Sequence, residues 1–154
     1  MILSAEPVSK IRRINLVGAI IVTHGNLAAE LIKSAEMILG RQKHLLPVCI
    51  KLNNGEEDIV HAIKKAISDV KPEEGILIFT DMFGGTPTNL SLSFMDEGKI
   101  EVVTGVNLPM LIKFLTEREH NPLQKLVSFC KQYGKKHIMV ASEILGQQKE
   151  EHNN

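Results

Sequence analysis

The chain of 154 residues contains no Trp and few other aromatic residues, namely one Tyr and five Phe. It therefore lacks the aromatic platform on which proteins usually stack single-stranded nucleic acids. Charge of one sign is not in excess either, because 18 Lys and Arg balance 18 Asp and Glu. A surface without a strong basic field argues against nucleic acid or an anionic membrane as the main partner.

Cysteine is scarce, and Cys49 and Cys130 are isolated, with no C-x-x-C pair. They support neither a disulfide framework nor a zinc site and are typical of a reduced, cytoplasmic chain. No histidine has metal-ligand spacing to another His, Cys or carboxylate, so we expect no bound metal. The apolar run 15–22 follows Arg12 and Arg13 but is far shorter than the roughly 20 residues of a membrane span.

Strand-like and helix-like segments alternate along the chain. Continuous apolar runs rich in β-branched residues predict strands, and apolar residues recurring with the helical period predict helices. The expected strands lie at 15–22, 45–52, 75–80 and 100–104, with a last strand at 136–141. The expected helices lie at 26–39, 56–70, 86 to about 95, 109 to about 118 and 121 to about 134.

This alternation predicts one α/β domain with a doubly wound, mainly parallel sheet of four core strands and helices on both faces, because parallel neighbours need crossover connections. We expect the domain to cover residues 14–142, preceded by an extension at 1–13 and followed by a polar tail at 143–154. Neither a repeat nor a Pro/Gly/Ser-rich linker divides it.

Polar residues follow the strands at the edge where open α/β sheets bind their ligands. His24 ends the first strand and Asp81 follows the third, so the two side chains are expected to be neighbours. A neutral imidazole can act as a nucleophile, and a carboxylate on its second nitrogen would fix the tautomer and stabilise the cation that forms. The same residues are equally compatible with a helix cap and a loop turn.

The loop after Asp81 has the composition of an anion site. Gly84 and Gly85 allow backbone amides to approach an oxyanion, and Thr86 adds a hydroxyl. Thr86 and Pro87 also fit the N-cap and first position of a helix, whose N-terminus favours negative charge. An ordinary capped helix after a tight loop is the alternative. The P-loop and dinucleotide-binding patterns are both absent.

Three blocks of the sequence resemble the mannose-type (mannose/fructose/sorbose) IIA component of the bacterial phosphoenolpyruvate-dependent sugar phosphotransferase system. The first block is 18–31, and the second, 80–89, matches that family's D-x-x-G-G-[ST]-P-x-N loop. The third, 103–111, is similar to its G-V-N-[LI]-P-M-L segment. The blocks occur in the family's order and span residues 15–118.

The resemblance implies a phosphohistidine carrier. His24 would accept a phosphoryl group from the phosphocarrier protein HPr and pass it to a IIB component. Asp81 would orient and polarise the ring, and Thr86 with the amides of Gly84 and Gly85 would hold the phosphoryl oxygens. The family needs no metal or organic cofactor in this domain.

The resemblance also implies a cytoplasmic homodimer in which residues 136–141 form a strand exchanged between subunits. The IIB partner would lie on another chain, and an indirect association with the membrane components IIC and IID is compatible with that arrangement. Two other readings remain open: a stand-alone regulatory phosphorelay module without transport, and a phosphoryl donor to a dihydroxyacetone kinase. The second fits less well, because the corresponding loop of those donors resembles D-M-G-S-A rather than the Gly84–Pro87 segment.

Overall fold

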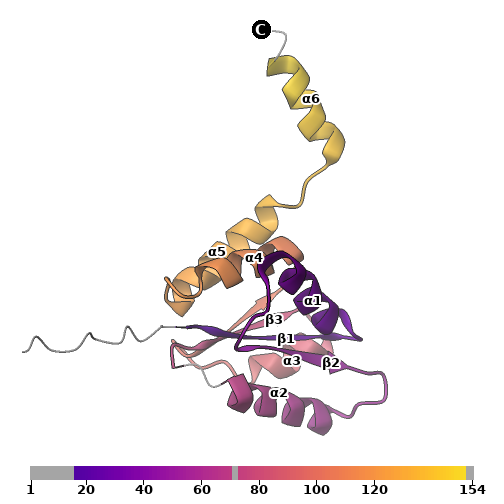
Figure 1. The fold of residues 1–154 in the computed structure, drawn as a ribbon. Helices are drawn as coiled ribbons and strands as arrows, with labels where there is room; N and C mark the ends of the chain where they lie inside the picture. The colour runs from indigo at the N-terminus through magenta and orange to yellow at the C-terminus, as the bar shows by residue number, and fades with distance from the viewer. Residues whose placement is uncertain (1–15, 71–72, 152–154) are drawn as a thin grey trace, which may run out of the picture.

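A computed structural model describes residues 16–70 and 73–151. Its centre is a four-stranded parallel sheet, in the order β2-β1-β3-β4 (Figure 1). The strands are β1 (Gly18–His24), β2 (Leu45–Ile50), β3 (Ile76–Thr80) and β4 (Ile100–Thr104). A helix lies in each connection, which confirms the predicted α/β fold class. The expected extension at 1–13 lies outside the described residues.

Helices cover both faces of the sheet. α1 (Leu27–Leu39), α4 (Leu108–Glu117) and α5 (Leu123–Lys136) pack on one face, and α2 (Glu56–Val70) and α3 (Thr86–Leu92) pack on the other. Two apolar cores result, one on each side of the sheet. No helix among the described residues is long and apolar enough to span a membrane.

The burial of each strand follows its place in the sheet. The two central strands β1 and β3 are buried along nearly their whole length, as their continuous apolar sequences predict. At the β2 edge, the amides of Ala19 and Gly25 donate to the carbonyls of His44 and Ile50, so the even-numbered residues face β1. Pro47 consequently faces outward, where its missing N–H costs no ladder hydrogen bond.

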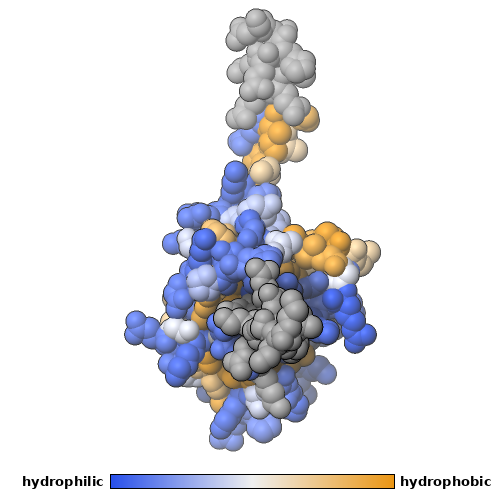
Figure 2. Space-filling model, turned by 60° about the vertical axis from the view of Figure 1, so that its left-hand side comes forward, coloured by the Kyte–Doolittle hydropathy of each residue, from blue (hydrophilic) through white to orange (hydrophobic). Residues whose placement is uncertain are grey.

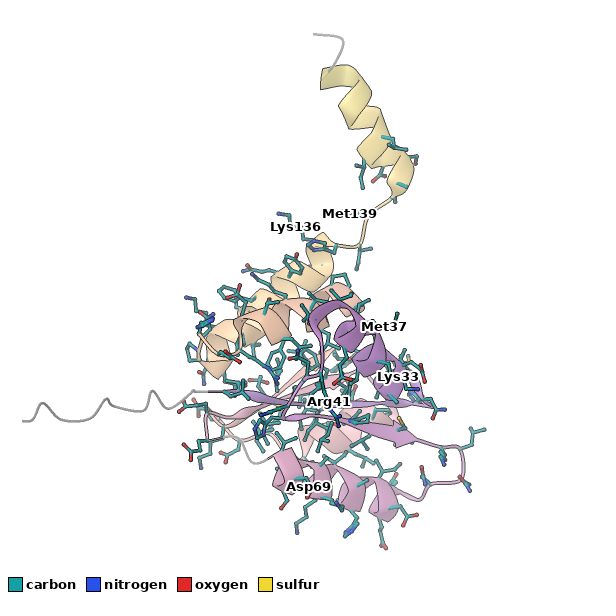
Figure 3. The ribbon with its side chains drawn as sticks, viewed as in Figure 1. Lys33, Met37, Arg41, Asp69, Lys136 and Met139 are labelled. Carbon is teal, nitrogen blue, oxygen red and sulfur yellow. The ribbon has the colours of Figure 1, made fainter. Side chains whose placement is uncertain are left out.

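The strand expected at 136–141 is not present in the described chain. α5 continues to Lys136, and His137 caps it and stacks on Tyr133 with ring centroids 3.9 Å apart. Ile138, Met139 and Val140 are exposed and pair with no strand of the described residues. Met139 lies on the connection between α5 and α6 (Figure 3). A strand exists only where its backbone finds a pairing edge, and this apolar run reaches none within one chain.

Most of the expected polar tail at 143–154 is helical. Helix α6 (Ala141–Glu151) begins here and extends away from the rest of the protein. Its first turns carry the exposed Ile144 and Leu145. Together with 138–140 they form an apolar stretch at the base of the projecting segment (Figure 2).

The helix expected from Thr86 to about Met95 is shorter than predicted. α3 ends at Leu92, with Ser93 as its C-cap, and its N-cap is Gly85 rather than Thr86. Thr86 is the first helical residue, and its side chain makes no capping hydrogen bond. With only seven residues, α3 contributes less to an anion site than the expected longer helix would.

Candidate functional site

The direction in which successive strands are added to the sheet reverses between β1 and β3. From β1 the chain goes to β2 on one side, and β3 then returns to the other side of β1. In open α/β sheets this switch point is where the strand ends separate and a ligand can enter. His24 is the last residue of β1, and Asp81 directly follows β3. The predicted pair therefore lies at this switch point.

Two hydrogen bonds join His24 to Asp81. The backbone amide of His24 donates to Asp81 Oδ2 at 2.8 Å, and His24 Nδ1 lies 2.8 Å from the same oxygen. The second carboxylate oxygen, Oδ1, accepts from the backbone amide of Met82 at 2.9 Å. The imidazole side chain is 52% exposed while the carboxylate is 13% exposed, so the ring faces solvent and the carboxylate that holds it is largely buried.

The pKa of Asp81 lies below its ordinary value. Burial of the carboxyl acts to raise the pKa, but the hydrogen bonds from the His24 amide and imidazole, the charge on that ring and the Met82 amide together outweigh burial. An ionised carboxylate only accepts hydrogen bonds, so the facing Nδ1 carries the proton of a neutral imidazole. Nε2 then keeps the lone pair, so it is the ring nitrogen that could act as a nucleophile.

The backbone on both sides of His24 is also fixed. Thr23 is fully buried, and its hydroxyl accepts a 2.8 Å hydrogen bond from the amide of Ala28 in the first turn of α1. Gly25 turns the chain with a φ of +56° and donates its amide to Ile50 at the end of β2. The residues on both sides of His24 are thus held by hydrogen bonds, one to the first turn of α1 and one to the end of β2.

The loop after Asp81 brings two glycines to the imidazole. Gly84 has a φ of +81°, a conformation that side chains with a Cβ rarely adopt. At Gly85, a Cβ would lie 3.0 Å from His24 Cε1 and 3.6 Å from Nε2. Glycine at this position therefore lets the loop approach the Cε1–Nε2 side of the ring.

The loop contains donors that could bind an anion. Within residues 16–70 and 73–151, the amides of Phe83, Gly84 and Gly85 donate to no acceptor. The Thr86 side chain is exposed beside them, with no hydrogen bond of its own in the described part of the chain. The structure thus brings Gly85 against His24 and places Gly84 and Thr86 on either side of it.

Three buried threonines of the site, Thr23, Thr80 and Thr88, were missed from sequence. Thr23 caps α1, while Thr88 donates from α3 to the Met82 carbonyl at 2.6 Å and lies 2.7 Å from the hydroxyl of Thr80. A threonine at the last buried position of a strand, directly before a turn and a helix, would have been a signal for Thr23 and Thr80. The Thr88 contact depends on the loop conformation, which no local pattern predicts.

Other candidate groups lie elsewhere. Cys130 is buried in the core beneath α1, α4 and α5, and Cys49 packs against that core. Among the described histidines, His44 bonds the Val70 carbonyl and His137 that of Tyr133, each through Nδ1. Within the described residues, no group of three or more His, Cys, Asp or Glu could hold a metal ion.

Apolar side chains are exposed on the two segments that flank the imidazole, the start of α1 and the loop after Asp81. Leu27 from the start of α1 and Met82 and Phe83 from the loop are all exposed, Phe83 to 74%. Exposed apolar residues around a polar centre are typical of a protein docking surface. Fold and site together define a class of protein: an open α/β domain that presents an imidazole, oriented by a carboxylate, on a surface able to meet another protein.

Comparison with known proteins narrows this class to a family. The family model described as the PTS system fructose IIA component, EIIA-man, matches residues 18–131. The chain is 33% identical over 131 residues to the fructose-specific EIIA component of Bacillus subtilis, covering 84% of this chain and 90% of that protein. It is 30% identical over 124 residues to the mannose-specific EIIAB component of Escherichia coli, but spans only 38% of that longer protein.

A solved structure agrees. The phosphotransferase system component EIIA of Streptococcus agalactiae superposes with a TM-score of 0.76 at 28% identity, covering 83% of this chain and 99% of that one. The chain belongs to the mannose-type family of IIA components of sugar phosphotransferase systems, which are phosphoryl carriers. The family match ends within α5, so the 138–140 segment and α6 lie beyond it.

Proposed function

We propose that this chain accepts a phosphoryl group from phospho-HPr on Nε2 of His24 and passes it to a IIB component. The observation that carries the proposal is the 2.8 Å contact between His24 Nδ1 and Asp81 Oδ2. This contact holds the proton on Nδ1 and leaves the lone pair on the exposed Nε2. The proposal deepens the family assignment by naming the atom, the donor and the acceptor.

The transfer exchanges one P–N bond for another. The Nε2 lone pair of His24 attacks the phosphorus of the phosphohistidine on HPr, and the donor's P–N bond breaks with its electron pair returning to the donor imidazole. Positive charge develops on the His24 ring because Nδ1 keeps its proton, and the Asp81 carboxylate stabilises that charge. The same steps in reverse order deliver the phosphoryl group to IIB. Positioning and electrostatics therefore dominate catalysis.

The phosphoryl oxygens would be held by the loop. The amides of Gly84 and Gly85 and the hydroxyl of Thr86 lie at the end of the loop that touches the His24 ring. Backbone donors of this kind stabilise transferring phosphoryl charge without a metal or an organic cofactor. The exposed Leu27, Met82 and Phe83 supply an apolar rim on which HPr and IIB would dock in turn.

The chain would act in the cytoplasm as a homodimer, and IIB would link it to the membrane components IIC and IID. The dimer is supported by two complementary features. β4 is an edge strand whose outer side carries no partner strand within the described residues, only an isolated bridge between Asp96 and Ile100, and the exposed segment 138–140 is apolar and pairs with no strand there. Pairing that segment with β4 of a second copy would satisfy both. Analytical ultracentrifugation tests this, and a monomer at micromolar concentration would contradict it.

A phosphotransfer assay tests the proposed function. The purified chain is incubated with phosphoenolpyruvate, enzyme I and HPr, and the proposal predicts an acid-labile, alkali-stable phosphate on His24. The variant His24→Ala should take up no label, whereas His120→Ala, which alters an exposed histidine far along the chain, should label like the parent. Equal labelling of His24→Ala would overturn the assignment. Chase of the label onto IIB tests the second half of the relay.

A further inference from the structure

We propose that Thr88 is a positioning residue for the phosphoryl transfer and acts by fixing Asp81 against His24. This inference rests on the proposed function and adds a residue to it. The Thr88 side chain lies at the start of α3, where it is 1% exposed, and it does not face the surface on which a partner would dock. Its effect on transfer must therefore pass through its hydrogen bonds.

One hydroxyl holds both chain neighbours of Asp81. Thr88 Oγ1 donates to the backbone carbonyl of Met82 at 2.6 Å, and it lies 2.7 Å from Oγ1 of Thr80. A threonine hydroxyl has one proton, and Thr88 gives its proton to Met82, so Thr80 donates to Thr88. Thr80 and Met82 precede and follow Asp81 directly. Thr88 thus holds the residue before Asp81 and the residue after it, and so fixes the backbone that carries the catalytic carboxylate.

The clamp extends to the carboxylate itself. The amide of Met82 donates to Asp81 Oδ1 at 2.9 Å, while Asp81 Oδ2 accepts the two hydrogen bonds from His24. The Met82 residue is therefore bound at its carbonyl by Thr88 and at its amide by Asp81. If the Thr88 hydroxyl is lost, the 82–83 peptide loses the bond to its carbonyl. The Met82 amide that donates to Asp81 Oδ1 is then held less firmly, and so is the angle of the carboxylate to the imidazole.

The hydrogen bond between the Thr80 and Thr88 hydroxyls is buried. Thr80 and Thr88 are both essentially inaccessible, so neither hydroxyl can replace its partner with water. Thr104 offers a contrast at the end of the adjacent strand β4. Its hydroxyl is buried too, but has no hydrogen-bond partner among the described residues. Removing the Thr88 hydroxyl should therefore slow phosphoryl transfer, whereas removing the Thr104 hydroxyl should not.

The test compares three variants with the parent in the HPr phosphotransfer assay. Thr88→Val removes the hydroxyl and keeps the shape, and we expect a roughly tenfold lower maximal rate, as for one lost hydrogen bond, with an unchanged KM for phospho-HPr. Thr88→Ser keeps the hydroxyl and should restore the rate to within about twofold of the parent. Thr104→Val is the matched control and should transfer at the parent's rate.

A double-mutant cycle separates positioning from general structural damage. If Thr88 acts through Asp81, Thr88→Val should slow the parent but have less than about twofold effect in an Asp81→Asn background. An equal slowing in both backgrounds would overturn the proposal, as would a Thr88→Val protein that transfers at the parent's rate. ¹⁵N NMR of the His24 ring gives a second readout, because a displaced carboxylate should reduce the population of the Nδ1–H tautomer.

Three further outcomes are decisive. Should Thr88→Val fail to fold, a folded Thr88→Ser protein that loses tenfold or more in rate would overturn the proposal, because its hydroxyl is retained. If the parent itself takes up no phosphate on His24, the proposed function fails and this inference fails with it. If the parent is labelled and the Thr88 variants are indifferent, only the inference fails.

Discussion

Replacing Asp81 by asparagine removes the charge that faces the Nδ1 proton of His24 while keeping an oxygen in the same place. In the parent, Nδ1 and Asp81 Oδ2 lie 2.8 Å apart, and Oδ2 also accepts from the His24 amide. The lost charge matters most during transfer, because the ring becomes cationic when Nε2 takes up the phosphoryl group. The variant should therefore fold and bind HPr but transfer slowly.

The size of the effect follows from the geometry. Because the imidazole side chain is 52% exposed, the effective dielectric constant lies between that of a protein surface and that of water. With a constant of about 40 to 80, two unit charges 2.8 Å apart attract with about 1.5–3 kcal/mol. Losing that attraction in the transition state lowers the rate roughly ten- to hundredfold.

The assay is rapid-quench transfer of phosphate from phospho-HPr, with Asp69→Asn as the matched control. Asp69 lies on the outer side of α2, where it pairs with Lys65, and should not affect transfer (Figure 3). An Asp81→Asn protein that transfers within twofold of the parent would refute the reasoning. So would an Asp69→Asn protein that is slowed as much as Asp81→Asn.

The same variant carries a pH signature. The pKa of Asp81 is lowered in the folded chain, so its ionised form stabilises the fold at a pH above the ordinary range of Asp, and that contribution is lost as the pH falls through the lowered value. The difference in melting temperature between parent and Asp81→Asn should thus stay constant from about pH 5 to 8 and shrink below about pH 4. A difference that grows in acid would contradict the assigned direction.

Three predictions concern other positions. Gly85→Ala should slow transfer roughly tenfold, because the new Cβ would meet His24 Cε1 at 3.0 Å, and an unchanged rate would exclude this close contact. The melting temperature should change little, because φ at Gly85 is an ordinary −83°. Arg118→Met should destabilise the fold by about 2–3 kcal/mol in urea unfolding, because the buried guanidinium binds two backbone carbonyls of the segment before β2. Burial raises the pKa of Cys130 to about 12, so a thiol reagent at pH 8 should modify Cys49 first and Cys130 only on unfolding. Rapid modification of both cysteines in the folded protein would argue against the packing of α5.

The sequence predicted the order of the central elements because each carries its own periodicity. β1 and β3 are continuous apolar runs, and α1, α2 and α4 show helical stripes that do not depend on their neighbours. The strand predicted at 136–141 is absent from the described residues for the opposite reason. Such a run favours a strand only if another strand lies beside it, and that condition belongs to the tertiary or quaternary structure.

For the site, the meeting of His24 and Asp81 could be predicted from topology alone. Both residues stand at the carboxyl ends of strands expected to be neighbours, and the structure brings them within hydrogen-bond distance. The contact of Gly85 with the ring and the clamp from Thr88 could not be predicted. They depend on a loop whose turns are fixed by several residues at once, including the positive φ of Gly84.

The most direct test of the account is the ring position of the phosphate. The chain is phosphorylated through enzyme I and HPr, the modified residue is mapped by mass spectrometry, and ³¹P NMR of the native protein distinguishes the two phosphohistidine isomers. The account predicts a single phosphate on His24, bonded to Nε2, because Nδ1 is held by Asp81. A phosphate on Nδ1 of His24, or on another histidine, would contradict it.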